Sequence, residues 1–240
     1  MAEGADCTFR YRLNPFMVFP GFHGVWGQGM AGFLSNFRNT IVASLILAAL
    51  FVAAFGWFAP GQYDLNFAIA VLRWAHVACG ILWVGLLYYF NFVQIRVMPD
   101  IPAELKPAVS KYIAPEALFW FRWAALLTVI LGLTIAGHRG YVVQTLTLGF
   151  GVWGHQGIVL THAPVTQFTL LGIGMWLGII MMFNVWGVIW PAQKIALGIK
   201  DATPEKKAAA AKRAMVFSRI NTLLSLPMLV AMTMYQTLFG

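Results

Sequence analysis

The sequence predicts an all-α fold, a polytopic membrane helix bundle of about five transmembrane helices. Sixty per cent of its 240 residues are hydrophobic, only 10% are charged, and the mean hydropathy is +0.74. In soluble globular domains about a quarter of the residues are charged, so the composition excludes that class. Several apolar runs are close to the ~20 residues that a helix needs to cross the hydrocarbon core. We expect an interfacial N-terminal arm at residues 1–40 and a membrane helix bundle at residues 41–240.

The arm precedes the first long apolar run. Residues 14–36 are rich in Phe, Gly and Trp, contain Pro15 and Pro20, and include no stretch long enough to span a bilayer. This composition favours a segment that lies at the membrane interface or contacts a partner. His23 stands among glycines, which is typical of a hydrated loop histidine.

Five apolar runs follow and give the predicted spans. Pro60 and Gly61 end the first run and Pro191 ends the fourth, because proline and glycine interrupt helices. Pro227 predicts a kink in the last span. Polar loops are expected after the second and fourth spans, at residues 94–115 and 194–213. The spans themselves are expected at residues 41–58, 67–92, 117–136, 166–190 and 220–239.

Residues 141–164 are apolar enough to cross the membrane but are broken by four glycines, so two interpretations are open. With five spans, the arm and the loops at 94–115 and 194–213 share one side and carry three, three and six basic residues. A sixth span would move the most basic loop outside, against the positive-inside rule. We therefore expect a cytoplasmic N-terminus, a periplasmic C-terminus and a re-entrant or interfacial cap at 141–164, in a bacterial inner (plasma) membrane.

The second span carries the candidate site. Arg73, His76, Gly80 and Trp83 follow one another at spacings of three, four and three, so they share one face of a helix. Ionisable groups at membrane depth are costly and mark functional sites. A b-type haem needs histidine ligands, a small residue beside the macrocycle, aromatic walls and cations for its propionates, and these residues are of those types. A structural hydrogen bond to a neighbouring helix and proton handling are the alternative roles for His76.

Three other histidines are assigned to the same outer side. His76 lies about ten residues into its span, or roughly 15 Å of helix rise from the outer end. His138 follows the third span, and His155 and His162 belong to the predicted cap. Neutral imidazole is the commonest transition-metal ligand. We expect a haem or metal held by His76 and one of these three, with Arg73 pairing with a propionate or an anionic substrate.

The cysteines and the missing motifs narrow the chemistry. Cys7 and Cys79 lie far apart and no Cys-x-x-Cys-His run is present, so neither a disulfide framework nor a c-type haem is expected. The chain also lacks a Walker A motif, a Gly-x-Gly-x-x-Gly run after a strand and a His-Glu-x-x-His motif. Because most basic residues of the +8 chain flank apolar runs, we assign them to topology and to anionic lipid head groups, and expect no nucleic acid.

Three blocks, in the same order along the chain, resemble a known family. They are residues 73–90 (Arg-Trp-Ala-His-Val, then Gly-Ile-Leu-Trp-Val-Gly, then Tyr-Tyr-Phe), residues 184–194 (Asn-Val-Trp-Gly-Val-Ile-Trp-Pro-Ala-Gln-Lys) and residues 218–228 (Ser-Arg-Ile-Asn-Thr-Leu-Leu-Ser-Leu-Pro-Met). Together they look like the N-terminal membrane domain of the bacterial membrane-bound, cytochrome c-linked urate oxidase family. The resemblance implies an inner-membrane domain associated with oxidation of urate to 5-hydroxyisourate and with electron delivery to a C-terminal cytochrome c domain. This chain ends at Gly240 without a c-type haem motif, so the expected acceptor is a separate cytochrome c.

Two functional hypotheses follow. The leading one is an inner-membrane oxidoreductase of the urate oxidase membrane-domain type. It would bind b-type haem near the periplasmic face and pass electrons, with urate as the candidate donor, to a periplasmic cytochrome c. The alternative is a non-catalytic membrane subunit that docks through its aromatic arm into a larger respiratory or photosynthetic complex.

Overall fold

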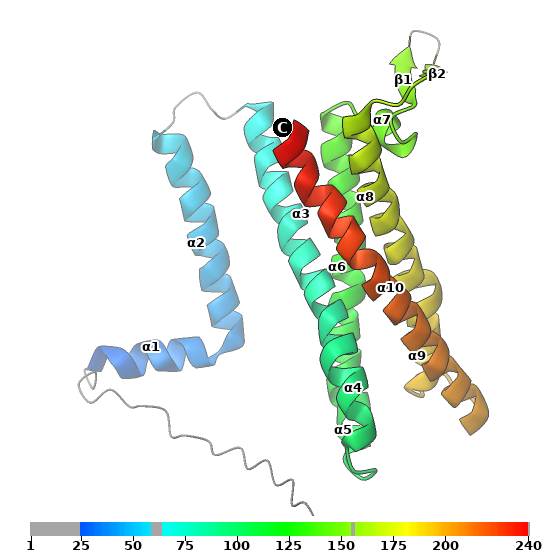
Figure 1. Ribbon diagram of the computed structural model, residues 1–240. Helices are drawn as coiled ribbons and strands as arrows, with labels where there is room; N and C mark the ends of the chain where they lie inside the picture. Colours follow the sequence, from blue (N-terminus) through cyan, green and yellow to red (C-terminus); the bar gives the residue numbers. More distant parts are fainter. Residues whose placement is uncertain (1–24, 59–63, 155–156, 240) are drawn as a thin grey trace, which may run out of the picture. The chain divides into compact units, whose positions relative to one another are not determined.

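The computed structural model describes residues 25–58, 64–154 and 157–239, and nearly all of them are helical. Five helical segments are long and apolar enough to cross a membrane, as predicted (Figure 1). They are Phe37–Phe58, Leu65–Asp100, Lys106–His138, Thr166–Ala196 and Pro204–Phe239. The chain divides into two compact units, the first containing α1 and α2 and the second beginning at Asp64.

The first unit is a short helix followed by a span. Helix α1 (Val25–Ser35) ends just before α2 (Phe37–Phe58). Between them, the side-chain oxygen of Asn36 accepts a hydrogen bond from the backbone N–H of Arg38 at 3.0 Å, as an N-cap does. Figure 1 shows α1 running across the end of α2, which agrees with an interfacial segment that leads into a span. The rest of the predicted arm, including His23, lies outside the described residues.

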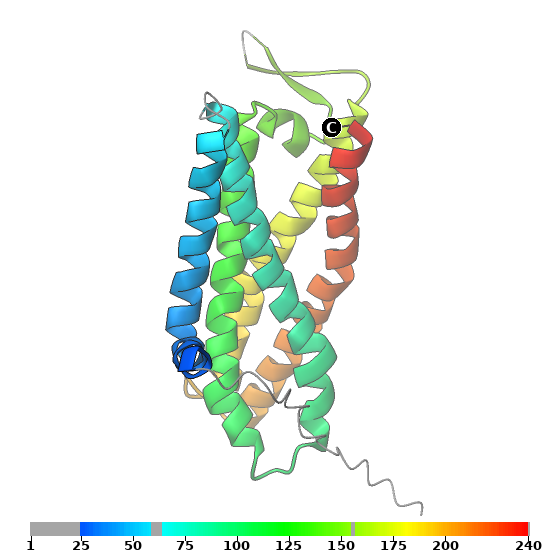
Figure 2. The same cartoon turned by 90° about the vertical axis from the view of Figure 1, so that its left-hand side faces the viewer.

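The second unit is built on four long helices. They are α3 (Leu65–Tyr88), α6 (Ala114–His138), α8 (Thr166–Phe183) and α10 (Pro204–Phe239). Helix α3 packs along α6, and α8 packs along α10 (Figures 1 and 2). The Asp64 carboxylate caps α3 by accepting hydrogen bonds from the Phe67 backbone N–H and the Asn66 side-chain amide, both at 2.9 Å. These bonds favour the charged form, so the pKa of Asp64 is lowered.

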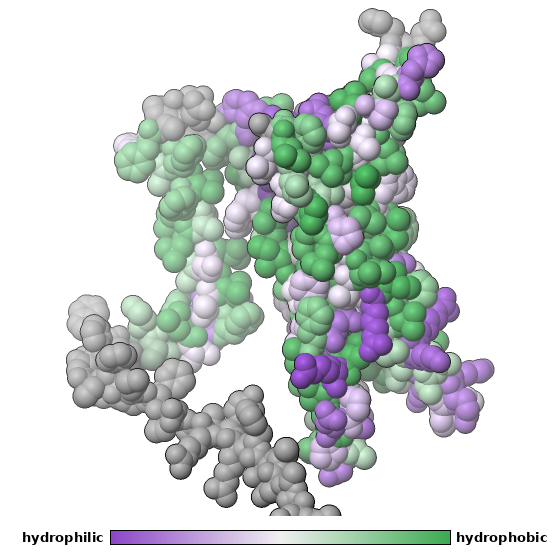
Figure 3. Space-filling view, in the orientation of Figure 1, coloured by the Kyte–Doolittle hydropathy of each residue, from purple (hydrophilic) through white to green (hydrophobic). Residues whose placement is uncertain are grey.

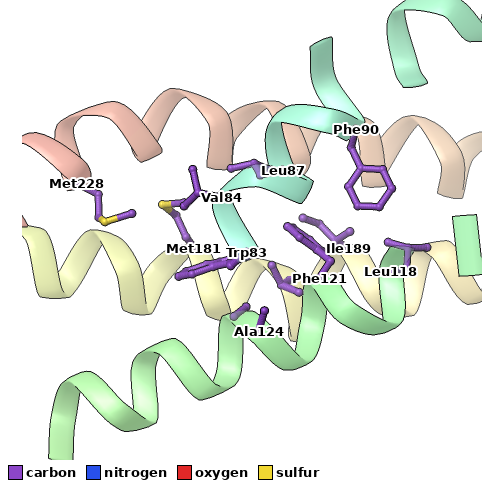
Figure 4. Close-up of a cluster of buried hydrophobic side chains, with 12 residues drawn as sticks. Trp83, Val84, Leu87, Phe90, Leu118, Phe121, Ala124, Met181, Ile189 and Met228 are labelled. Carbon is purple, nitrogen blue, oxygen red and sulfur yellow. The ribbon is translucent and has the colours of Figure 1, made fainter. Parts of the chain in front are cut away.

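The core of this unit lies between the four helices, in the half away from the start of α3. Trp83 and Leu87 of α3, Phe121 of α6 and Met181 of α8 are at most 1% exposed and belong to one apolar cluster (Figure 4). Phe90 meets Phe121 edge-to-face, with ring centroids 5.5 Å apart. All four residues lie in predicted spans, so the helices are held together by side chains deep in the bundle.

Helical structure continues into both segments that were predicted as loops. Helix α10 begins at Pro204, well before the predicted residue 220, so most of the basic 194–213 segment is helical. Alanine has the highest helix propensity, and residues 208–211 are all alanine. Figure 3 shows hydrophilic residues gathered at this end of the second unit. The other extensions are η1 (Tyr89–Gln94), α4 (Ile95–Val97), η2 (Met98–Asp100), α5 (Lys106–Ala108), η3 (Val109–Ile113), η4 (Asn184–Ile189) and α9 (Trp190–Ala196).

The predicted cap at residues 141–164 does not span the membrane. It contains the short helix α7 (Val142–Leu146) and an antiparallel hairpin of β1 (Gly151–Gly154) and β2 (Gly157–Leu160). It lies at the end of the unit where α3 and α8 begin and where α6 and α10 end (Figures 1 and 2). The sequence prediction of a cap in place of a sixth span is therefore confirmed.

Side chains of α8 tie the cap to the bundle. Thr169 donates its hydroxyl to the Leu148 carbonyl at 2.8 Å, and Trp176 donates its indole N–H to the Leu146 carbonyl at 3.0 Å. Between them, Gly172 lies against the carbonyl of Thr145, where a Cβ atom would overlap the backbone oxygen. The absence of a side chain at Gly172 thus lets α7 approach α8.

The two helical pairs of the second unit carry the same sequence pattern. A Trp-x-Gly-x-x-x-x-Phe-Asn run ends at Asn91 in the first pair and at Asn184 in the second. An Arg-x-x-x-Leu-Leu-Thr/Ser run follows in each partner helix and ends at Thr128 and Ser225. Both asparagines lie in π-helical turns, η1 and η4, at matching positions. Because α3 and α8 begin at the same end, the pairs form a parallel repeat.

Candidate functional site

His76 lies at the interface between α3 and α6. Its Nδ1 is 2.8 Å from the backbone carbonyl oxygen of Thr128. A carbonyl can only accept a hydrogen bond, so the neutral ring must carry its proton on Nδ1. This arrangement leaves the Nε2 lone pair available to accept a proton or to bind a metal, and it fixes the orientation of the ring.

A glycine of α6 makes this position possible. A Cβ atom on Gly132 would lie 2.9 Å from Cε1 and 3.3 Å from Nδ1 of His76, closer than side chains pack. The small residue that the imidazole requires is therefore on the facing helix. A Cβ on Gly80 would lie 3.8 Å from the Thr128 methyl group, which is ordinary contact, so the space expected for a macrocycle at Gly80 is occupied by α6.

Trp83 lies deeper in the same interface. It is 1% exposed and packs in the apolar cluster with Phe121 and Ala124 of α6 (Figure 4). Its indole N–H is buried and has no hydrogen-bond partner among the described residues. His76, Gly80 and Trp83 thus all face α6, and Trp83 serves as core; a role for it in cofactor binding stays a prediction.

Arg73 lies one helical turn closer to the start of α3 than His76. It lines an open pocket of about 370 Å³ together with Arg139, which follows the last residue of α6. The remaining lining residues are Ala70, Trp74 and Val77 of α3. Arg139 was not among the predicted site residues, because the sequence does not show which helix end meets Arg73.

The other predicted histidine ligands do not gather around His76. His138 is exposed at the end of α6, six residues or roughly 9 Å of helix rise beyond Gly132. His162 is exposed in the segment before α8, and His155 lies outside the described residues. Within residues 25–58, 64–154 and 157–239, no three His, Cys, Asp or Glu side chains form a group that could hold a metal.

The residues present would therefore supply one histidine ligand to a haem but not a complete pocket. His76 has the tautomer that a ligating histidine needs, and Arg73 is on the same helix for a propionate. Gly80 and Trp83 pack against α6, so the face of α3 that they form has no room for a haem beside His76.

The repeat makes the position of His76 informative. The equivalent position in the second pair is Thr169, which bonds the cap through the Leu148 carbonyl. The first pair thus has an imidazole facing its partner helix where the second has a structural threonine. If the bundle binds a ligand through this position, only the first helical pair can do so.

Sequence reasoning missed a group of buried polar residues between α10 and the π-helical turns. The Asn91 side-chain amide donates to Ser218 Oγ at 2.8 Å, and that of Asn184 donates to the Asn221 side-chain oxygen at 2.8 Å. Tyr88 OH and Ser225 Oγ are 3.0 Å apart, the Asn221 amide donates to the Met181 carbonyl at 2.9 Å, and Asn91 Oδ1 is buried without a partner among the described residues. All three blocks of the urate oxidase resemblance meet here. The repeated Trp-x-Gly-x-x-x-x-Phe-Asn pattern is the signal that would have found both π-turn asparagines.

No protein-family model, curated protein or solved structure matches the chain. The urate oxidase resemblance stays a prediction. What the site can do is therefore argued from His76, the two arginines and the membrane position of the helices that carry them.

Proposed function

We propose that the chain is an inner-membrane redox protein that binds b-type haem through Nε2 of His76, near the periplasmic face. Electrons, with urate as the candidate donor, would pass to a separate periplasmic cytochrome c. The observation that carries the proposal is the 2.8 Å hydrogen bond from His76 Nδ1 to the Thr128 carbonyl. A bound haem supplies one-electron redox chemistry, which none of the chain's own side chains at this site offers.

The protein's own contribution at this site is orientation and charge. The Thr128 carbonyl holds the imidazole in one tautomer, and Gly132 leaves room for the ring against α6. Arg73 is the nearest cation of the predicted stripe and would pair with a propionate or an anionic substrate. His76 is 11 residues after Leu65, where α3 begins, and 18 residues before Gln94, where η1 ends, so it is closer to the end that carries the cap.

The topology supports a periplasmic position for the site. The segments Met98–Asp100 and Trp190–Ala196, with the start of α10, lie at the end opposite the cap (Figures 1 and 2). The basic residues of 194–213 gather at that end, which the positive-inside rule assigns to the cytoplasm. The cap and His76 would then face the periplasm, where a cytochrome c could accept electrons.

A visible spectrum of the purified protein tests haem binding. We expect a Soret band in the wild type that is lost in His76→Ala and kept in the matched control His138→Ala, whose side chain is exposed at the end of α6. Thermal unfolding of each variant shows whether the band was lost with the fold. A colourless wild-type protein from cells supplied with haem, or a band unchanged in His76→Ala, would contradict the proposal.

Urate as electron donor needs its own test. We expect urate to reduce added cytochrome c in the presence of the wild type but not of His76→Ala. A protein that keeps its haem band and shows no urate-dependent reduction would be an electron carrier for another donor. The two measurements thus separate haem binding from the substrate.

A second candidate is a non-catalytic subunit of a larger respiratory or photosynthetic complex. The observation in its favour is that apolar side chains of α2, among them Phe51, Trp57 and Phe58, are not buried within the unit that α1 and α2 form. Such a surface fits lipid or an apolar protein partner equally well. Purification in mild detergent followed by mass spectrometry decides: a large complex that is lost on removal of residues 14–36 would favour the subunit.

A further inference from the structure

The pocket between Arg73 and Arg139 has two guanidinium groups from different helices. Both side chains are exposed, and both lie near the end of the bundle that carries the cap. Arg73 is nine residues after Asp64, the N-cap of α3, which corresponds to about 13 Å of helix rise. A long arginine side chain can cover part of this distance by extending toward the membrane interface. The pocket's volume of about 370 Å³ is large enough for a phosphate group.

The charge of this pocket is not neutralised by the protein. Neither guanidinium has an ion-pair partner in the described part of the chain. Asp64, the carboxylate on the same helix, is used to cap α3. Burial raises the pKa of Tyr141, with Tyr235 adding to the increase, while Arg73 and Arg139 both act to lower it. Both cations thus act electrostatically on the same phenol.

An apolar stripe leads from the arginines toward the middle of the membrane. Trp74, Val77 and Ile81 follow at helical spacing along α3 and are 54%, 50% and 70% exposed. Trp74 and Val77 also line the pocket. A ligand that fills both regions must carry an oxyanion at one end and a long apolar body at the other.

We propose that Arg73 and Arg139 bind the phosphodiester of an anionic phospholipid, of the phosphatidylglycerol type, with an acyl chain lying along Trp74, Val77 and Ile81. Guanidinium groups bind phosphate through charge-assisted, often bidentate hydrogen bonds. In an anionic lipid no ammonium group neutralises the phosphate, so its full negative charge is available to the two arginines. Such a lipid therefore binds more tightly than a zwitterionic one. The occupant is a lipid of the outer leaflet if the predicted topology holds.

This lipid site is separate from the proposed haem ligand. His76 is not among the pocket residues, and its ring points to Thr128 and Gly132 of α6. The stripe of Trp74, Val77 and Ile81 is on another face of α3. The lipid proposal therefore does not rest on haem binding, and it assigns Arg73 to the lipid phosphate in place of a haem propionate.

Native mass spectrometry of the full chain tests the site. The protein is released from detergent with phosphatidylglycerol or phosphatidylcholine, and thermal unfolding is followed in parallel. We expect phosphatidylglycerol to bind and stabilise the wild type, with affinity about tenfold weaker in Arg73→Gln and in Arg139→Gln and still weaker in the double variant. The matched control Arg96→Gln with Lys111→Gln removes two exposed cations at the opposite end and should keep the lipid.

Three further arms decide between sources of the oxyanion. Lipid binding that persists in His76→Ala supports a site independent of the haem. Inorganic phosphate that stabilises the protein as much as the lipid does would overturn the lipid assignment, because it would need no apolar stripe. Equal lipid binding in the wild type and the double arginine variant would also overturn it. So would a double arginine variant that loses the Soret band but keeps its lipid binding, since the arginines would then serve propionates.

Discussion

At the residue scale, Gly132 controls where His76 can lie. The ring occupies the space in which a side chain of residue 132 would begin, at 2.9 Å from the position of a Cβ atom. The bond from Nδ1 to the Thr128 carbonyl depends on that close approach. Thr128 and Gly132, one turn apart on α6, therefore hold the imidazole: the first accepts its hydrogen bond, and the second leaves room for the ring.

The first prediction compares two glycines of the same interface. Gly132→Ala should displace the His76 ring and lower the free energy of unfolding by about 1–3 kcal/mol, as overpacking does. Gly80→Ala, whose Cβ would meet only ordinary contact at 3.8 Å, should be neutral or stabilise the helix by up to about 1 kcal/mol. Thermal or denaturant unfolding in detergent measures both. Equal effects of the two substitutions would show that His76 does not fill the space at Gly132.

The periodicity of α3 predicted which residues share a face but not what they meet. Spacings of three and four place His76, Gly80 and Trp83 together, and the structure has all three facing α6. Which residues of α6 lie opposite depends on the register between the helices, which is set by side-chain packing along their whole length. Thr128 and Gly132 could not be identified without it.

At the element scale, the cap is held by one side of α8. Gly172 lets the Thr145 carbonyl of α7 touch the helix backbone. Trp176 donates to the carbonyl of Leu146, the last residue of α7, and Thr169 donates to that of Leu148 in the turn that follows. The cap therefore depends on a surface of α8 in which Gly172, between Thr169 and Trp176, has no side chain. This contact explains why an apolar segment such as 141–164 stays at the bundle end: its backbone polar groups are paired there.

The second prediction follows from that gap. Gly172→Ala should push α7 from α8 and raise hydrogen–deuterium exchange of the cap amides at least severalfold, while the spans stay protected. Gly178→Ala, on the same helix with no heavy atom within 4 Å of its Cβ position, is the matched control and should leave exchange unchanged. Unaltered cap exchange in Gly172→Ala would mean that the cap is held by other contacts.

The π-helical turns supply the polar contacts of α10. Asn91 and Asn184 occupy matching positions of the repeat and bond Ser218 and Asn221 of the same helix. In a membrane such hydrogen bonds contribute modestly, because an unfolded helix in lipid also finds partners. Their role is then chiefly to fix the position of α10 against both pairs.

The third prediction is a double-mutant cycle on the Asn184–Asn221 pair. Asn184→Leu, Asn221→Leu and the double variant should show a coupling energy of about 1 kcal/mol, because the 2.8 Å bond is lost in each single variant. The Asn91–Ser218 pair should give a coupling of the same sign. If the effects of Asn184→Leu and Asn221→Leu on the free energy of unfolding are additive, the hydrogen bond between these residues does not stabilise the fold.

Hydropathy located the membrane-crossing part of each element but not its ends. The fourth span was predicted to begin at residue 166 and does so, whereas α10 begins at Pro204 in place of residue 220. The alanine-rich segment before residue 220 is charged, so hydropathy rejects it, but its helix propensity lets α10 continue into water. Hydropathy thus predicts where the membrane-crossing part begins, whereas the helix itself begins earlier.

At the scale of the whole molecule, the second unit is two similar helical pairs with different tasks. The first pair places His76 against its partner helix, and the second uses the equivalent Thr169 to hold the cap. The span-by-span prediction captured the number of membrane-spanning helices and the cap. It overlooked the duplication because matching positions are 93 residues apart in α3 and α8, for example Trp83 and Trp176.

The last prediction concerns the orientation of this arrangement. With five spans, the positive-inside rule predicts that the connection between α9 and α10, which carries basic residues, is cytoplasmic and that the hairpin of the cap is outside. In a chain whose native cysteines are replaced by serine, Ile158→Cys should react with a membrane-impermeant maleimide in intact spheroplasts. Lys200→Cys should react only after lysis.

Both positions suit the experiment because Ile158 is 54% exposed and Lys200 is exposed. The reverse labelling pattern would contradict the charge argument and would move His76 to the cytoplasmic half, away from a periplasmic cytochrome c. If Lys200→Cys and Ile158→Cys are labelled from opposite sides, the chain must cross the membrane once between them, whichever side each faces. Helix α8 alone supplies that crossing. Labelling of both from the same side would therefore contradict a single membrane crossing by α8.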